Sequence, residues 1–192
     1  MGTEEIIQSQ YQELCRVVEA SKGATGTVAA MADLVVGALR AGGKVLCAGN
    51  GGSAADALHM AEELVGRYRG DRRSLPGISL AADATALTCI GNDYGFDAIF
   101  SRQVEGLGQP GDVFVGFSTS GNSANIIQAV EASRRLGLKV ILLLGKDGGK
   151  LKGQADAEWI VPHTDTARIQ EMHGWAMHGM LEVVEAAFPE AG

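Results

Sequence analysis

A histidine and a glutamate four residues apart form a pair that could transfer a proton. His59 and Glu63 fall in the segment 53–67, whose apolar periodicity predicts a helix, so both side chains lie on one helix face. Their neighbours are largely apolar, and a buried carboxylate must be paired, protonated or bound to a metal ion. Glu63 is therefore a candidate general base, although a surface hydrogen bond without any chemistry has the same spacing.

Two loops of small residues follow apolar segments that are predicted to be buried strands. The first loop, 50–53, comes after 44–48, and the second, 118–123, comes after 112–117. Each leads into a predicted helix, whose N-terminal N–H groups and dipole favour a phosphate. The second loop is the better phosphate site because it adds four hydroxyl groups, those of Ser118, Thr119, Ser120 and Ser123. A helix-capping turn with additional serines is the alternative.

The glycine pattern also permits a dinucleotide-binding turn. Gly49-x-Gly51-x-x-Ala54 fits the loose fingerprint of such turns. The acidic residue that would bind the ribose is expected about 20 residues further on, where the sequence instead reads Arg-Tyr-Arg-Gly at 67–70. The segment 145–147 lacks the upstream glycine and the hydroxyl residue of a P-loop. Nucleotide binding is therefore the less favoured interpretation.

Alternating strands and helices must position these residues. The predicted strands are 44–48, 76–80, 112–117, 139–144 and 158–161, and the main helices among them are 53–67, 124–136 and 168–188. Continuous apolar strands joined through helices are typical of a parallel sheet that is covered on both faces. We expect one domain, residues 1–192, with a five-stranded parallel sheet in a three-layer α/β/α sandwich of flavodoxin- or Rossmann-like type. Two further N-terminal helices, separated at 21–26, carry more apolar surface than one sheet face needs, which indicates oligomerisation.

The composition argues against several classes of partner. The formal net charge of −7 disfavours a broad nucleic-acid-binding face. No apolar run approaches the ~20 residues that cross a bilayer, and the acidic N-terminus is unlike a signal peptide. The three widely spaced cysteines, Cys15, Cys47 and Cys89, do not form a disulfide framework. We expect a cytoplasmic protein that binds neither nucleic acid nor membranes.

Several motifs together resemble those of the SIS (sugar isomerase) domain, and more closely those of the phosphoheptose isomerases, also called sedoheptulose 7-phosphate isomerases. They extend across nearly the whole chain, at 47–53, 59–63, 66–68, 91–93, 118–123 and 168–173, with His178. The serine loop marks the superfamily, whereas Glu63 and the segment 168–171 narrow the resemblance to this group. The resemblance implies conversion of D-sedoheptulose 7-phosphate to D-glycero-D-manno-heptose 7-phosphate through an enediol(ate). This reaction is the first step toward the heptose of lipopolysaccharide or related glycans.

The resemblance also implies roles for individual residues. Glu63 would be the base that moves the proton, and His178 would be its acid–base partner. Phosphate would bind to Ser118, Thr119, Ser120 and Ser123, and the sugar site would be lined by Asn50, Gly51, Gly52, Ser53, Glu63, Arg67, Asn92, Asp93 and Gln170. One Zn²⁺ per subunit would be held by His59, Glu63, Gln170 and His178, in a homotetramer whose active sites combine residues of neighbouring subunits. Spacing alone leaves this metal site open, because Gln170 and His178 lie about 12 Å apart along a helix axis.

One position departs from the family pattern, and two alternative functions stay open. Some relatives carry an acidic residue where Ala167 stands, and the nearest acid here is Asp165, which puts a sugar contact at this position in question.

A non-catalytic SIS protein, such as the tetrameric factor that assists the bacterial replication initiator, would lack the glutamate that this chain retains as Glu63. Other phosphosugar isomerases, such as those related to arabinose 5-phosphate isomerase, often carry regulatory domains for which this chain has no room.

Overall fold

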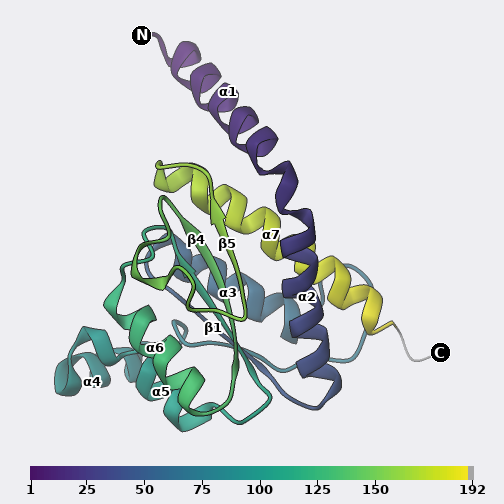
Figure 1. Ribbon diagram of the computed structural model, residues 1–192, viewed down its shortest axis with the longest axis vertical. Helices are drawn as coiled ribbons and strands as arrows, with labels where there is room; N and C mark the ends of the chain where they lie inside the picture. The colour runs from purple at the N-terminus through teal and green to yellow at the C-terminus, as the bar shows by residue number, and fades with distance from the viewer. Residues whose placement is uncertain (190–192) are drawn as a thin grey trace.

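The computed structural model describes residues 1–189 and contains a five-stranded sheet (Figure 1). The strands lie in the order β2-β1-β3-β4-β5, and every neighbouring pair is parallel, as predicted. They are β1 (Val45–Gly49), β2 (Gly77–Ser79), β3 (Val113–Ser118), β4 (Lys139–Gly145) and β5 (Ala157–Val161). The α-helices are α1 (Thr3–Ser21), α2 (Thr25–Arg40), α3 (Gly52–Val65), α4 (Ala84–Tyr94), α5 (Ser101–Leu107), α6 (Ala124–Arg135) and α7 (Thr166–Ala187). Short 3₁₀ turns are η1 (Lys22–Ala24), η2 (Phe96–Ala98) and η3 (Gly149–Leu151).

Helices cover both faces of the sheet, which confirms the predicted three-layer α/β/α sandwich. Side chains alternate along each strand, so β3 sends Val115 and Phe117 to one face and Phe114 to the other. The first face packs against α2, α3 and α7, and the second against α5 and α6 (Figure 1). Because both faces are buried, the strands are apolar without interruption, and each fully buried large side chain contributes about 1.5–3 kcal/mol.

The N-terminal helix α1 extends away from the rest of the molecule (Figure 1). Its side chains Ile6, Ile7, Tyr11 and Val18 are exposed. The predicted separation at 21–26 is only the 3₁₀ turn η1, after which α2 begins directly. Because a 3₁₀ turn continues the helical path of the chain, the two N-terminal helices are nearly continuous.

Helix α3 ends earlier than the predicted helix 53–67. It closes at Val65, and the N–H of Gly66 donates to the carbonyl of Glu62 at 2.7 Å. Arg67 therefore lies beyond the helix, in the connection that leads to β2. This difference matters because a side chain past the helix end no longer shares the face that carries His59 and Glu63.

The structure also bears on the predictions about cysteines, membrane spans and domain extent. All three cysteines are free thiols, and Cys47 is buried within β1. Within residues 1–189, no helix is both long enough and apolar enough to span a bilayer. The predicted single domain, 1–192, includes three C-terminal residues outside the described range, and its extent stays a prediction.

A buried histidine ties α7 to the carboxyl end of β4. The ring Nε2 of His173 lies 2.9 Å from the carbonyl oxygen of Leu144 and donates to it in the neutral tautomer that places the proton on Nε2. The side chain is fully buried. Burial lowers the pKa of His173 to about 4, although the hydrogen bond to Leu144 opposes this shift. His173 is therefore neutral at pH 7 and serves as a structural donor.

This burial predicts a loss of stability in mild acid. Between pH 6.5 and 4 the unfolded chain binds a proton at His173 and the folded chain does not, so the free energy of unfolding falls as pH drops. The loss from this residue amounts to about 3 kcal/mol at most. The variant His173→Gln keeps an N–H donor for Leu144 but does not titrate. Urea unfolding at pH 7 and pH 4.5 should show a smaller pH dependence for the variant; an equal dependence would contradict this role.

Candidate functional site

The site lies where the chain leaves two neighbouring strands toward opposite faces of the sheet. Helix α3 follows β1 onto one face, and α6 follows β3 onto the other. Such a divergence leaves a crevice at the carboxyl ends of the strands, which is the usual ligand position in open α/β sheets. A cavity of about 280 Å³ opens there, lined by Asn50, Gly51, Gly52, Ser53, Phe117, Ser118, Thr119, Ser123, Thr166 and Gln170. Seven of the loop residues predicted for substrate binding are thus brought together with Gln170.

The glycine loop after β1 needs its small residues. Gly51 has φ +58°, a conformation that side chains rarely adopt. A Cβ on Gly52 would lie 2.5 Å from the amide nitrogen of Gln170, so the absence of a side chain lets α7 approach the loop. The loop therefore forms one wall of the cavity and brings the α7 amide into it.

The serine loop after β3 forms the opposite wall. The hydroxyl of Ser118 accepts a hydrogen bond from the N–H of Gly121 at 3.1 Å and lies 3.4 Å from the hydroxyl of Ser123. Ser123 is the N-cap residue of α6, so hydroxyl groups and a helix N-terminus meet at one point. The hydroxyl of Ser120 accepts from the N–H of Asn122 at 3.2 Å and stays partly exposed. This arrangement suits a phosphate, and the binding role itself stays a prediction.

A pair of amides, which the sequence patterns did not reveal, connects the two loops. Asn50 and Asn125 exchange two hydrogen bonds, each 2.9 Å long, from the amide nitrogen of one to the amide oxygen of the other. Asn125 is buried in the first turn of α6. An asparagine directly after a capping serine is a weak sequence signal, because its partner lies 75 residues away in the chain.

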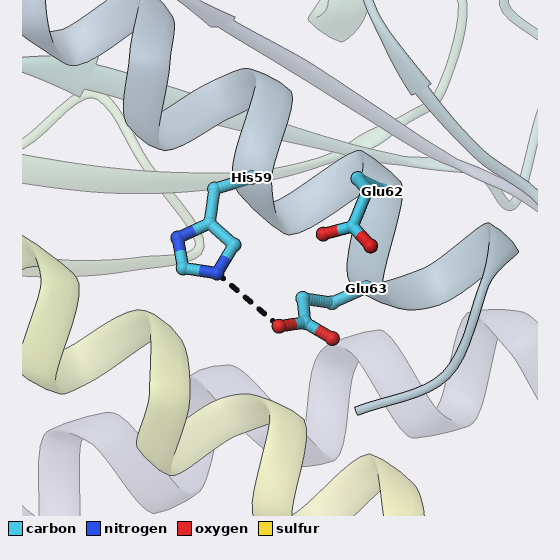
Figure 2. Close-up of side chains that lie close together, drawn as sticks. All are labelled: His59, Glu62 and Glu63. Carbon is cyan, nitrogen blue, oxygen red and sulfur yellow. Dashed lines mark hydrogen bonds and ion pairs between the residues drawn. The ribbon is translucent and has the colours of Figure 1, made fainter. Parts of the chain in front are cut away.

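The candidate acid–base residues His59 and Glu63 lie on α3 beside α7. Figure 2 shows the imidazole of His59 directed at the carboxylate of Glu63, with Nε2 and Oε1 3.2 Å apart. The side chain of Glu63 is 15% exposed, as expected for a largely buried carboxylate, whereas that of His59 is 43% exposed. The side chain of His59 is therefore more exposed than its apolar sequence neighbours suggest. The possible ligand atoms of His59, Glu62 and Glu63 all lie within 4.8 Å of one another.

Helix α7 brings a second histidine to this group. The ring of His178 lies 5.1 Å from that of His59, nearly perpendicular to it, and stacks on Tyr68 at 5.8 Å. Two imidazoles and a carboxylate are a donor set that zinc accepts, so these residues fit the predicted metal. Gln170 contacts Gly52 at the other end of this stretch of α7, so its place among the ligands stays a prediction.

Asp56 adds a titratable carboxyl group that sequence reasoning missed. It lies one turn before His59 on α3, and within residues 1–189 its buried Oδ2 has no hydrogen-bond partner. Burial raises the pKa of Asp56 to about 6, and the nearby His59 opposes part of this shift. The segment therefore holds a carboxyl group that changes charge close to neutral pH.

Three predicted sugar-site residues lie away from the cavity. Arg67 is exposed beyond the end of α3. Asn92 and Asp93 are exposed on α4, and the Asn92 amide donates to the Asp93 carboxylate at 2.7 Å. Helix α4 packs on the α6 side of the sheet, whereas α7 packs on the other side. Within one chain these residues do not complete the predicted site.

The acid nearest to Ala167, Asp165, is engaged in a helix cap. The carboxylate of Asp165 caps α7 by accepting from the N–H groups of Ala167 at 2.8 Å and Arg168 at 3.2 Å. These hydrogen bonds lower the pKa of Asp165. Because its carboxylate is engaged at the helix N-terminus, Asp165 does not replace an acidic side chain at position 167.

Comparisons with known proteins agree with this geometry. The SIS domain family matches residues 9–145 of the chain. A phosphoheptose isomerase of Helicobacter hepaticus is 46% identical over 97% of this chain and 95% of its own length. A phosphoheptose isomerase of a Geobacter strain is 50% identical over 94% of this chain and 95% of its own.

Solved structures give the same family. A phosphoheptose isomerase structure from Neisseria gonorrhoeae is 42% identical and has a TM-score of 0.92, covering 96% of this chain and all of its own. One from Francisella tularensis is 35% identical with a TM-score of 0.93 over 97% of this chain. A putative phosphosugar isomerase from Bacteroides fragilis, 17% identical with a TM-score of 0.70, shares the fold alone. The chain belongs to the SIS domain family and, within it, to the phosphoheptose isomerases.

Proposed function

We propose that this protein is an aldose–ketose isomerase that converts D-sedoheptulose 7-phosphate to D-glycero-D-manno-heptose 7-phosphate. The observation that carries the proposal is that α3 and α7, which bring Glu63, His59 and His178 together, also contribute Gly52 and Gln170 to the cavity walled by the serine loop. Similar proteins of high identity are named phosphoheptose isomerases. The reaction would supply the first intermediate toward the heptose of lipopolysaccharide or related glycans.

The substrate phosphate binds in the serine loop. The hydroxyl groups of Ser118, Thr119, Ser120 and Ser123, with the N-terminus of α6, donate to its oxygens. Asn50, Gly51, Gly52, Ser53 and Gln170 line the adjoining wall, where they contact the sugar. Binding at the remote phosphate positions the reacting carbons without taking part in the chemistry.

Proton transfer occurs at the other end of the substrate. Glu63 removes a proton from C1 of the open-chain ketose, which leaves an enediol(ate), and returns the proton to C2. His178 moves the accompanying proton from the C1 oxygen to the C2 oxygen and assists opening of the sugar ring. The carbonyl group thereby passes from C2 to C1, and atoms and charge balance without an external reactant.

A zinc ion fits the same group of side chains. His59, Glu63, Gln170 and His178 would hold it, and three of these four side chains lie together in this chain. Bound Zn²⁺ would supply a Lewis acid that polarises the substrate oxygens. The chain's own residues still provide the base, the proton shuttle and the phosphate site.

We propose that the functional unit is a homotetramer located in the cytoplasm. The extended helix α1, with exposed Ile6 and Ile7, offers apolar surface to neighbouring subunits. Arg67, Asn92 and Asp93 are exposed away from their own cavity, which suits residues that reach the site of a neighbour. Free cysteines are compatible with a reducing compartment.

The reaction itself is the first test. Incubation of the protein with sedoheptulose 7-phosphate should yield the aldose, detected by NMR and mass spectrometry. Glu63→Gln should lower kcat by about 10²–10⁴-fold while calorimetric binding of the phosphosugar is largely kept, since only the base is lost. Glu131→Gln, the same change on an exposed site of α6, should behave as wild type. No conversion by the wild-type protein would instead support a non-catalytic SIS binding protein.

His178 provides the second test. His178→Ala should reduce kcat by about 10²-fold or more, because proton transfer between the substrate oxygens loses its carrier. Circular dichroism should show an intact fold. His163→Ala removes an imidazole from outside the site and should have little effect on kcat. A fully active His178→Ala variant would rule out this role.

Metal content provides the third test. Elemental analysis should find about one zinc per subunit, and chelation should remove both zinc and activity until zinc is restored. His178→Gln should lose zinc, whereas Glu62→Gln should keep it if the four-residue set is the ligand set. Full activity of zinc-free protein would show that the metal has no part in the reaction.

A further inference from the structure

A buried arginine closes the end of the helix that carries Glu63. The side chain of Arg72, in the connection between α3 and β2, is only 2% exposed. Its Nη2 donates to the carbonyl of Glu63 at 2.6 Å, and its Nη1 donates to the carbonyl of Leu64 at 3.0 Å. Carbonyls in the last turn of a helix lack helical N–H partners, and a cation there also complements the helix dipole. Arg72 thus binds the main chain of the proposed base itself.

The same guanidinium is joined to α7. Its Nε donates to Oε2 of Glu185 at 3.2 Å, and Oε1 of Glu185 accepts from the N–H groups of Arg69 and Gly70. Burial alone would raise the pKa of Glu185, but these N–H donors and Arg72 outweigh it and lower the pKa. The carboxylate is therefore charged at neutral pH and bound at both oxygens.

The connection carries one further contact to the proton-transfer group. Tyr68 stacks on the ring of His178, and its hydroxyl donates to the carboxylate of Glu182 at 3.4 Å. Residues 68–72 therefore bind the end of α3 on one side and α7 on the other. Glu63 and His178 lie on the two helices that this connection holds together.

We infer that Arg72, held by Glu185, is a positioning residue that fixes Glu63 relative to His178 during proton transfer. The inference rests on the proposed function, because it assigns importance to the distance between these two groups. Displacement of reacting groups by about 1 Å can cost about 10²-fold in rate. Loss of the link should therefore slow the chemical step more than it weakens binding at the distant serine loop.

The identity of the residue is part of the inference. The guanidinium of Arg72 donates to three main-chain carbonyls, including that of Arg73, and to a carboxylate at once, because its N–H groups form a rigid planar fork. An ammonium group keeps the charge but not this geometry. Arg72→Lys should therefore restore part of the activity that Arg72→Met loses.

The experiment compares this link with a second buried ion pair, which lies just before β3, the central strand of the sheet. Asp112 is 2% exposed, pairs with Lys44 at 2.7 Å and accepts from the N–H groups of Lys44 and Gln109. Within residues 1–189, none of its hydrogen bonds or ion pairs involves α3, α7 or the connection between α3 and β2. Both Asp112→Asn and Arg72→Met remove a buried charge, so Asp112→Asn controls for a loss of stability that leaves the link intact.

Steady-state kinetics with sedoheptulose 7-phosphate should separate the variants of the link from Asp112→Asn. The folded fraction of each variant is measured by circular dichroism. Arg72→Met and Glu185→Gln should lower kcat by about 10–100-fold, whereas KM should change by less than about threefold. The kcat of Arg72→Lys should lie between those of Arg72→Met and wild type. Asp112→Asn should keep kcat despite a lower Tm. If Arg72→Met does not fold, the milder Glu185→Gln decides.

Two results would overturn the inference. One is a kcat in Glu185→Gln and the folded Arg72 variants that equals wild type; the other is an equal loss in Asp112→Asn. An inactive wild-type protein would instead refute the proposed function, and an active Glu63→Gln variant would refute the role of Glu63 as the base on which the inference depends. These outcomes differ in which protein fails, so the two ideas can be separated.

Discussion

The opposite exits of α3 and α6 from two adjacent parallel strands constrain the whole site. Since β1 and β3 are hydrogen-bonded neighbours, their following loops must begin side by side, and since the helices then diverge, no backbone fills the space between them. The reciprocal amides of Asn50 and Asn125 set the spacing of the loops across this gap. Every polar group assigned to the phosphate depends on that spacing.

A second constraint comes from how α7 lies along α3. Gln170 meets Gly52 near the start of α3, and His178 meets His59 about two turns later, so the helices run side by side in the same direction. This stretch spans about 10–12 Å, given the rise of an α-helix. A heptose 7-phosphate carries its phosphate and its reacting carbons at opposite ends. One helix pair can therefore serve both ends of such a substrate.

Much of this arrangement could be predicted from local sequence, and the rest could not, for physical reasons. Uninterrupted apolar strands and small-residue turns predicted the five-stranded parallel sheet and both loops, because these depend on periodicity and on backbone freedom. Partners distant in sequence left no local pattern, so Asn125 and Arg72 were missed. The burial of Asp56 could not be predicted because it depends on packing. The end of α3 before Arg67 could not be predicted because it depends on the hydrogen bond from the N–H of Gly66 to the carbonyl of Glu62.

The serine loop is supported by main chain from a distant part of the sequence. A Cβ on Gly121, where φ is +62°, would lie 1.9 Å from the carbonyl oxygen of Gly148, so the two backbones are in direct contact. The N–H of Leu151 also donates to the Gly121 carbonyl at 3.0 Å. A loop fixed in this way has little conformational freedom left to lose when an anion arrives. If this loop binds the substrate phosphate as proposed, we expect its affinity to depend mainly on the donors it presents, and the connection between β4 and β5 to support binding without touching the ligand.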